Sequence, residues 1–361
     1  MPSKKAPRVR APKPAKKVSL KSLADRLGLS PATVSLVMNR SAVADSIPQD
    51  TKDRIFAAAA KYKYRPNFVA RSLRTQRSFM IGVLVPEVSE GYAAMVMSGI
   101  EDHLLHEGYF YFVASHRHRA DLIDEYPKLL LARSVDGLIA VDTPWTHDNL
   151  GIPVVTISGH NHVKGVTNIL LDHQMAARLA LEHLVRQGHE RVAFIKGQEF
   201  SSDTQVRWNA IVETAGRLHL KIHSKLTTQL RGDQPTPDLG YHVTQKLLAK
   251  GEPFTALFSF NDISAIGAIR ALREAGLRVP EDVSVVGFDD ITGAAFQNPS
   301  LTTVRQPLRK MGVIAAEHLL QRIARPNSDS FPRLITVEPE FMVRNSTGRA
   351  PGQKLSLRKV K

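Results

Sequence analysis

The sequence is notable first for what it lacks. It contains no cysteine, which excludes disulfide bonds and metal sites built from thiolates. No apolar run approaches the roughly 20 residues that span a bilayer, and the basic N-terminus is not followed by the apolar core of a signal peptide. We therefore expect a cytoplasmic protein that makes no contact with a membrane.

Motifs of common enzymes are also missing. The chain has no Walker loop, no Gly-x-Gly-x-x-Gly run after a strand and no Gly-x-Ser-x-Gly elbow. His116 and His118 stand close together in an expected loop, but two histidines without a third ligand are weak evidence for a metal site. We expect them to face solvent or a ligand. The sequence thus predicts a protein that is not an enzyme and has neither a cofactor nor a metal.

Charge is plentiful but uneven. The formal net charge is +15, yet residues 1–78 hold 18 Lys and Arg against 4 Asp and Glu. Residues 349–361 add five basic residues and no acid, and the stretch 79–348 is slightly acidic. A basic head of this kind releases counterions from DNA and binds it in a salt-dependent way. A solvated basic tail with no specific partner is an adequate explanation for the charge of residues 1–17 and 349–361. It does not explain residues 18–65, because their apolar residues recur at the spacing of folded helices.

Residues 18–41 have the pattern of a helix-turn-helix. An apolar stripe recurs at helical spacing through Leu20, Leu23, Ala24 and Leu27. Gly28 permits a tight turn, and Ser30 followed by Pro31 suits the start of a second helix. The apolar face then continues through Val34 and Val37, whereas other side chains point elsewhere, namely Thr33, Ser35 and Asn39. Two helices joined in this way place the second in a major groove of DNA.

The rest of the chain divides by composition. A third helix is expected from about Pro48 to Tyr62, and residues 66–77 form a short helix that is marginal on its own. From Phe79 onward, apolar strands alternate with helices, which predicts two α/β lobes with parallel sheets. The expected strands are 80–86, 109–115, 137–143, 153–158, 191–197, 255–260 and 283–289. The expected helices lie near 92–107, 121–132, 173–187, 204–218, 240–250, 264–275 and 310–324.

Ligands of such folds bind at the carboxyl ends of the strands. Polar residues that follow the expected strands are therefore candidates for a binding site. They are Glu87, Ser89, Asp142, Ser158, Asn261, Asp262, Asp289 and Asp290. Asp262 and Asp290 have a simpler alternative role as caps of the helices that follow them.

Several segments together resemble the LacI/GalR family of bacterial transcription regulators. They are the helix-turn-helix, YRPNFVARSLR, FSFNDISAIGAIRALREAGLRVPEDVSVVGFDD and LTTVRQP, and the resemblance covers roughly residues 18–345. It implies an all-α helix-turn-helix head and a hinge helix joined to a two-lobed α/β core like that of periplasmic binding proteins. The corresponding domains are a disordered basic extension (1–17), the DNA-binding domain (18–65), the hinge (66–77), the effector-binding and dimerisation core (78–348) and a basic tail (349–361).

The resemblance also implies which residues contact DNA. Pro31 and Ala32 match positions that read base edges, and Thr33, Ser35 and Asn39 match positions that contact phosphates. The candidates are Ser19, Leu20, Ser30, Pro31, Ala32, Thr33, Ser35, Leu36, Asn39, Asn67, Ala70, Arg71 and Leu73. Leu36 departs from the family, which usually has arginine there. Leucine can contact a thymine methyl group but cannot form hydrogen bonds with guanine. The alternative is that Leu36 packs on neighbouring side chains and contacts no base.

The hinge carries the second implied DNA contact. Asn67, Ala70 and Arg71 match the hinge helix, and Leu73 matches the leucine that the family wedges into the minor groove. Such a wedge bends DNA by opening a base step; the alternative is that Leu73 packs on the core. Pro48 stands where the family often has a Ser or Thr cap, so a cap bond is lost.

For the effector, the resemblance points to residues of both lobes. They are Glu90, Tyr92, Asp172, Arg207, Asn261 and Asp289. Arg207 and Asp289 match residues that grip the effector, since a guanidinium donates to hydroxyls or carboxylates and a carboxylate accepts from hydroxyls. Glu90 replaces a more usual Asn and would repel an anion. A pairing of Arg207 with a surface acid is the structural alternative.

These features together predict a repressor that binds a pseudo-palindromic DNA operator as a homodimer and is controlled by a sugar or sugar derivative. The tail lacks heptad repeats, which favours a dimer over a tetramer. A protein corepressor in place of the small molecule is an open alternative. A solute-binding protein is disfavoured by the DNA head and the missing signal peptide, and a sugar-active enzyme by the missing motifs.

Overall fold

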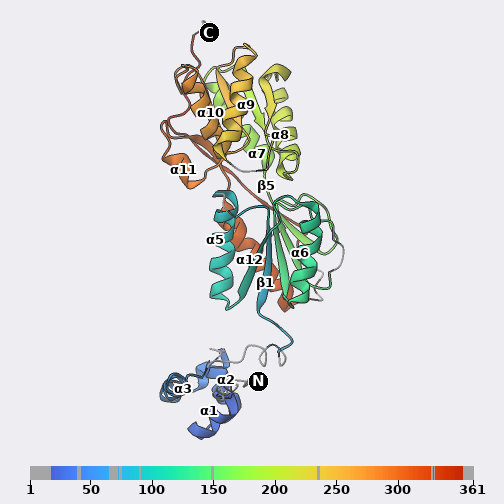
Figure 1. Cartoon of the computed structure of the whole chain (residues 1–361), viewed down its shortest axis with the longest axis vertical. Coiled ribbons are helices and arrows are strands. Elements are labelled where there is room, and N and C mark those ends of the chain that lie inside the picture. The colour runs from blue at the N-terminus through green and yellow to red at the C-terminus, as the bar shows by residue number, and fades with distance from the viewer. Residues whose placement is uncertain are drawn as a thin grey trace, which may run out of the picture. The chain divides into compact units, whose positions relative to one another are not determined.

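The computed structural model describes residues 18–38, 42–64, 72, 75–88, 91–147, 150–233, 236–326, 328 and 330–352. The chain separates into two compact units, Met1–Ser78 and Phe79–Lys361 (Figure 1). Each unit is described by itself. None of the helices in these ranges is both long enough and apolar enough to cross a membrane.

Helices are the only regular elements among the described residues of the first unit. Its elements are α1 (Leu20–Leu27), α2 (Pro31–Met38), the 3-10 helix η1 (Ala42–Ser46) and α3 (Gln49–Lys61). A small core of fully buried side chains, among them Leu23, Val34 and Ile55, joins the three α-helices. The predicted helix-turn-helix and third helix are therefore present.

Local signals set the boundaries of these helices. The Ser19 hydroxyl accepts a hydrogen bond from the Ser22 amide at 3.1 Å, and Gly28 ends α1 with φ +64°. The Ser30 hydroxyl accepts from the Thr33 amide at 3.0 Å, which caps α2. By contrast, Pro48 precedes α3 without a side-chain cap bond, as its lack of a donor or acceptor side chain requires.

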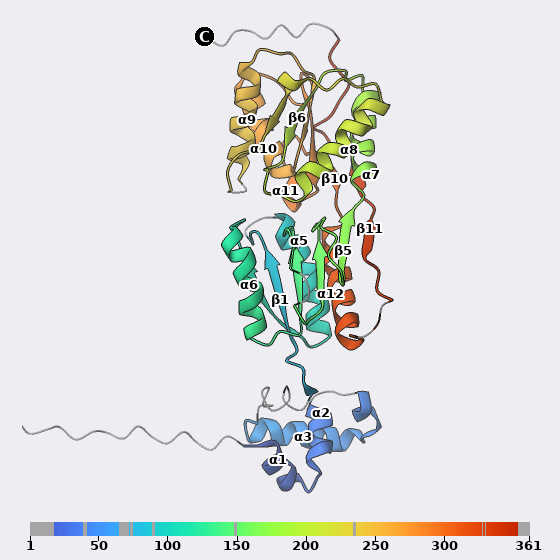
Figure 2. The same ribbon diagram turned by 90° about the vertical axis from the view of Figure 1, so that its right-hand side faces the viewer.

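The second unit has two lobes, each built on a six-stranded sheet (Figure 2). The strands of the first lobe are β1 (Met80–Val85), β2 (Phe110–Ser115), β3 (Gly137–Val141), β4 (Val154–Ile157), β5 (Val166–Leu171) and β11 (Leu334–Val337). Those of the second lobe are β6 (Val192–Lys196), β7 (Thr227–Gln229), β8 (Ala256–Ser259), β9 (Ser284–Asp289), β10 (Thr302–Arg305) and β12 (Glu340–Met342). The strand orders are β11-β5-β4-β3-β1-β2 and β12-β10-β9-β8-β6-β7. The β10–β12 pair is antiparallel; the other pairs of both sheets are parallel.

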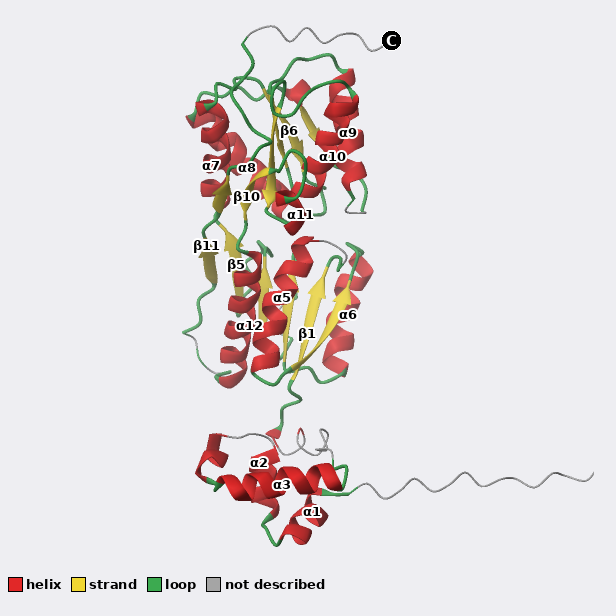
Figure 3. Cartoon of the chain, turned by 90° about the vertical axis from the view of Figure 1, so that its left-hand side faces the viewer, coloured by secondary structure: helices red, strands yellow, loops and turns green. Residues whose placement is uncertain are grey.

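Helices cover both faces of each sheet (Figure 3). The first lobe has α5 (Gly91–His106) and α12 (Leu308–Ala324) on one face and α6 (Ala120–Ala132) on the other. The second lobe has α7 (His173–Arg186) and α8 (Asp203–Arg217) on one face, with α9 (Pro237–Ala249) and α10 (Asp262–Glu274) on the other. Two short elements complete it, η2 (Ser224–Leu226) and α11 (Thr292–Ala295). Burial on both sides explains why the central strands read as continuous apolar runs; these strands are β1, β3, β4, β6, β8 and β9.

Every strand and helix expected between residues 80 and 324 is present, with ends displaced by at most a few residues. The short helix expected over 66–77 lies mostly outside the described residues. Five strands were not predicted, namely β5, β7, β10, β11 and β12. They are short or interrupted by polar residues, as in the Thr-Asn pair of β5, so periodicity does not reveal them.

The chain passes between the lobes three times, at β5–α7, at β10–α12 and at β11–β12. Consequently α12 packs on the first lobe although it follows a strand of the second. The carboxyl ends of the parallel strands of the first lobe meet loops of the second, and the interlobe pocket lies there.

Glycines permit the closest helix packing in the first lobe. A Cβ atom at Gly99 of α5 would collide with the Arg309 carbonyl oxygen of α12, and one at Gly312 would collide with the Val96 carbonyl oxygen. The two helices therefore approach each other backbone to backbone, which any side chain larger than hydrogen prevents.

Candidate functional site

The expected DNA-reading helix, α2, exposes its N-terminal end. Pro31 and Ala32 are exposed, as are the capping residues Ser19 and Ser30, whereas Thr33 and Leu20 are half-buried. The Ser30 and Thr33 hydroxyls lie 2.8 Å apart in a mutual hydrogen bond. Exposure at the start of this helix is what a groove-reading helix needs, and the base and phosphate contacts remain predictions.

Two residues of α2 need closer attention. The expectation that Ser35 points away from the apolar face is wrong, because Ser35 is only 6% exposed. Helix α2 is short and packs against both α1 and α3, so more than one stripe of it is covered. Leu36 is half-buried and packs on the core while keeping part of its surface open. Its contact with a base stays a prediction.

Some of the predicted site residues lie outside the described part of the chain. They are Asn39, Asn67, Ala70, Arg71, Leu73, Ser89 and Glu90.

The second site is a cavity of about 110 Å³ between the two lobes. Four of the predicted effector residues line it, namely Tyr92, Arg207, Asn261 and Asp289. Tyr92 stands at the start of α5, Arg207 on α8, Asn261 at the start of α10 and Asp289 at the end of β9. The structure brings together residues more than 190 positions apart, as the strand-end rule anticipates.

Asp172 does not line this pocket. Its carboxylate accepts a hydrogen bond from the Met175 amide at 2.8 Å and caps α7. A structural role therefore accounts for this acid. Asn261 has both roles: its side chain lines the pocket and caps α10 by accepting from the Ser264 amide at 2.9 Å.

The two acids expected as possible caps have other partners. The buried carboxylate of Asp262 accepts from the Ile291 amide at 2.9 Å and from the Thr303 hydroxyl at 2.5 Å. Asp290 pairs with Arg305 at 2.7 Å and with Arg344 at 2.6 Å. Both acids therefore fix the loop after β9 rather than the helices that follow them.

Arg207 is buried, with only 4% of its surface exposed. Its guanidinium donates to the Phe260 carbonyl and to Asp203 at 3.1 Å, so its partner is a buried acid and not a surface one. The guanidinium also stacks on Phe288, with its carbon 3.6 Å from the ring centre. The Arg207 Nε has no hydrogen-bond partner among the described residues, so a donor remains for a bound molecule.

Asp203 forms ion pairs with three side chains at the pocket, namely His160, His173 and Arg207. His160 Nε2 lies 2.6 Å from one of its carboxylate oxygens and His173 Nε2 lies 3.3 Å from the same oxygen. Burial alone would raise the pKa of Asp203, but the two histidines and Arg207 hold that pKa well below its usual range. Of this group, only Arg207 was predicted from the sequence. Asp203 was missed because it opens a helix and follows no expected strand, and no motif singled out His160 or His173.

Two other buried acids have the opposite shift. Burial, reinforced by the Asp203 charge, raises the pKa of Asp142 to about 7 although the Ser202 amide and hydroxyl donate to it. Burial likewise raises the pKa of Asp289 to about 7 against the pull of Arg207 and Gln306. These acids are costly to ionise in the folded state, which is typical of functional sites.

Of the paired histidines, only His118 faces the pocket, where it stacks on Phe200 at 4.0 Å between ring centres. His116 is fully buried and hydrogen-bonded to Thr143 at 3.0 Å. Burial lowers the pKa of His116 to about 4. The expectation of a solvent- or ligand-facing role is therefore wrong for His116, whose ring packs inside the first lobe.

The raised pKa of Asp289 predicts a pH effect on stability. Below pH 4 the carboxyl is protonated in both states, and between pH 4 and 7 it is ionised only in the unfolded chain. The contribution of Asp289 to the free energy of unfolding is thus complete at low pH and is lost as pH rises through 7. We expect Asp289→Asn to be more stable than the wild type at pH 7.5, by at most about 4 kcal/mol, and equal to it near pH 4.

Urea unfolding at several pH values, followed by tryptophan fluorescence, measures this difference. The exposed Asp238 of α9 gives the control, since Asp238→Asn should follow the wild-type profile. A profile of Asp289→Asn parallel to that of the wild type would contradict the prediction.

Each of the two units matches a known protein family. Residues 19–67 match the bacterial regulatory proteins of the lacI family, and residues 181–347 match the periplasmic binding protein-like domain. The chain is 30% identical over 338 residues to the HTH-type transcriptional repressor PurR of Haemophilus influenzae, covering 91% of this chain and 98% of that protein.

Solved structures agree with this assignment. The Lac repressor dimer bound to operator and the anti-inducer ONPF superposes with a TM-score of 0.76 at 26% identity, covering 92% of this chain and all of that one. A complex of the transcriptional regulator CelR with cellobiose superposes with a TM-score of 0.66 at 27% identity, covering 91% of this chain and 99% of that one. The chain belongs to the LacI family of bacterial regulatory proteins, and it joins that family's DNA-binding domain to an effector-binding core.

Proposed function

We propose that the protein is a repressor that binds a pseudo-palindromic operator as a homodimer and that a small molecule in the interlobe pocket controls its affinity for DNA. The observation that carries the proposal is the pocket, in which Tyr92 of one lobe faces Arg207 and Asp289 of the other. The Lac repressor dimer offers a precedent, since it was solved with operator and a small ligand.

The lining of the pocket favours a neutral, hydroxylated effector. Acidic groups outnumber basic ones, with five acids against Arg207 and His118; the acids are Glu87, Asp142, Asp203, Asp233 and Asp289. Carboxylates accept hydrogen bonds from hydroxyls and repel anions, while Phe200 and Phe260 offer aromatic faces to an apolar ring face. A sugar or uncharged sugar derivative fits this chemistry, and CelR was solved with cellobiose.

Hydrogen bonds between the lobes connect effector binding with the degree of lobe closure. The Ser202 hydroxyl of the second lobe lies 2.5 Å from both an Asp142 carboxylate oxygen and the Ser158 carbonyl oxygen of the first lobe, and its one hydrogen is shared between them. His160 forms an ion pair with Asp203 between the same two lobes. An effector that favours one degree of lobe closure shifts the balance between two states. By linkage, DNA must then change effector affinity by the same factor that effector changes DNA affinity.

The first experiment selects genomic DNA fragments on the purified full-length protein at physiological salt, followed by sequencing. Recovery of a pseudo-palindrome supports the repressor, and genes beside it nominate sugars for titration. Unrelated fragments, recovered both with and without metabolite extract, would contradict sequence-specific binding. Equal affinity for the effector in the presence and absence of operator would contradict the coupling.

Leu36 gives a prediction about base reading. Leu36→Arg places a bidentate donor on α2 at a half-exposed position, and such a donor pairs with guanine O6 and N7. We expect the selected half-site to gain a guanine at one position, preferred by about 1–3 kcal/mol over other bases. Leu36→Met is the matched control and should leave the half-site unchanged. An identical half-site for the arginine variant would show that residue 36 does not reach the bases.

A further inference from the structure

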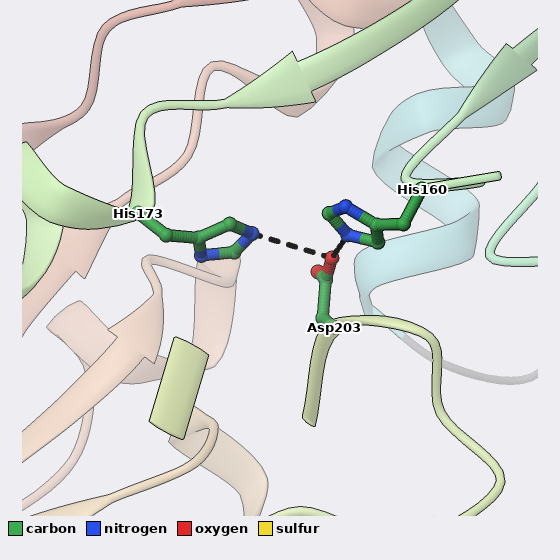
Figure 4. A group of neighbouring side chains, drawn as sticks. All are labelled: His160, His173 and Asp203. Atoms are coloured by element: carbon green, nitrogen blue, oxygen red, sulfur yellow. Dashed lines mark hydrogen bonds and ion pairs between the residues drawn. The ribbon is translucent and has the colours of Figure 1, made fainter. Parts of the chain in front are cut away.

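Three potential metal ligands converge at the wall of the pocket (Figure 4). His160 lies in the loop after β4 of the first lobe, while His173 opens α7 and Asp203 opens α8 in the second. One ligand atom of each residue lies within 4.8 Å of the others. The sequence gives no motif for this cluster, because its members come from three separate segments.

His173 indicates that a ligand belongs here. Its side chain is 4% exposed, and its Nδ1 has no hydrogen-bond partner within the described ranges, while its Nε2 forms an ion-pair contact with Asp203 Oδ1 at 3.3 Å but no hydrogen bond. A neutral imidazole offers the lone pair of one ring nitrogen to a metal ion. An unsatisfied buried polar group costs free energy, and a metal–nitrogen bond would remove that cost.

The spacing suits a tetrahedral ion. Ligand atoms about 2.0–2.1 Å from Zn²⁺ lie roughly 3.3 Å from each other, and His173 Nε2 lies 3.3 Å from Asp203 Oδ1. The 2.6 Å separation of His160 Nε2 from the same oxygen must lengthen by under about 1 Å to match that geometry. His160 is only half-buried and belongs to a loop, so this adjustment is small.

Arg207 is a positive charge close to this place and disfavours further positive charge at His173, but it contacts Asp203 on the oxygen that the histidines do not approach. Arg207 bonds Asp203 through Oδ2, whereas both histidines approach Oδ1, so the oxygen toward the histidines is left for an ion. Asp142 and Asp289, which also line the pocket, supply further negative potential when ionised. Two imidazoles and one carboxylate form a donor set used for zinc and for related transition metals.

We propose that His160, His173 and Asp203 bind one divalent transition-metal ion, of which Zn²⁺ is the type. Because His160 belongs to one lobe and the other two ligands to the other, the ion stabilises the closed cleft. Three protein ligands leave a coordination position for water or for a donor atom of an effector. The alternative is a hydrogen-bonded His–Asp–His group that binds no metal. The metal site does not depend on the identity of the effector.

The test uses tag-free, full-length protein from which metals have been removed by chelation, titrated with Co²⁺. Four-coordinate Co²⁺ absorbs strongly in the visible range, so the spectrum reports coordination directly. We expect saturation at one ion per chain, displacement by Zn²⁺, and a higher thermal midpoint for the metal-loaded protein.

His160→Gln and His173→Gln should each weaken Co²⁺ binding at least about tenfold, since each removes one of three ligands. His162→Gln is the matched control, because His162 lies in the same loop as His160 and is exposed; it should bind as the wild type does. Circular dichroism in chelator verifies folding, and the half-buried position of His160 keeps one variant usable if His173→Gln fails to fold.

Two outcomes would overturn the proposal. One is the absence of a saturable visible spectrum in the wild type, which leaves the hydrogen-bonded group. The other is unchanged Co²⁺ binding in a folded His160→Gln variant, which would assign the ion to surface histidines. Neither outcome affects the repressor, whose operator selection needs no metal.

Discussion

Replacing Arg207 with methionine is expected to lower the free energy of unfolding of the two-lobed core by about 3–5 kcal/mol. The guanidinium offsets the charge of the buried Asp203 and stacks on Phe288. Methionine keeps much of the aliphatic volume but leaves Asp203 with the two histidines alone. Removing one member of a buried ion pair costs far more than removing an exposed one.

The same helix provides the control. Arg217 pairs with Glu213 at 2.9 Å, with the same four-residue spacing as Arg207 and Asp203, but both side chains are about 60% exposed. Arg217→Met should cost no more than about 0.5 kcal/mol. Comparable losses for the two variants would contradict the view that burial makes the Arg207 pair important.

Fluorescence makes the measurement specific to the core. The chain has two tryptophans, Trp145 in the first lobe and Trp208 on α8. Urea unfolding followed at these side chains therefore does not report on the helix-turn-helix unit. The experiment is done in chelator, so that a metal at His160 and His173 does not contribute.

The second large effect is expected at Gly99, where alanine should destabilise the core by about 1–3 kcal/mol or more. The added methyl group would meet the Arg309 backbone carbonyl of α12, which no side-chain rotation can move aside. Helices α5 and α12 would have to separate, and the packing of α12 on β3 and β4 would loosen with them.

Gly216 near the end of α8 is the matched control. A Cβ atom there meets nothing within 4 Å, so Gly216→Ala should stabilise the helix by up to about 1 kcal/mol through its effect on backbone entropy. Opposite signs for the two substitutions, in the same urea assay, are the expected result. A neutral Gly99→Ala would show that the two helices tolerate separation.

The sequence predicted features that depend on neighbouring residues. Ser30, Pro31 and Gly28 set helix ends through local hydrogen bonds and backbone preferences, and those ends are where we expected them. Continuous apolar runs likewise revealed the central strands. Strands β10 and β12 were not predicted because a segment of three or four residues is too short to show a hydrophobic period. They are strands because of their hydrogen bonds to neighbouring strands in the sheet.

Prediction of the pocket was uneven for a similar reason. Arg207 and Asp289 were predicted from the resemblance to a family, and Asp142 from its place after a strand; all three line the pocket. His160 and Asp203 are separated by 43 positions, and their contact exists only because the two lobes close on each other. The prediction that Ser35 points away from the apolar face was wrong because α1 and α3 both cover α2. The apolar spacing within a single helix does not show that two neighbouring helices bury it.

The threefold passage of the chain between the lobes has a consequence for biosynthesis. The first five strands of the first lobe leave the ribosome early, but α12 and β11 are among the last elements to be made. Until then, the apolar face that α12 covers on β3 and β4 has no partner. We expect this half-finished lobe to be the stage at which the nascent chain depends most on chaperones, and truncation before residue 308 to leave neither lobe able to fold.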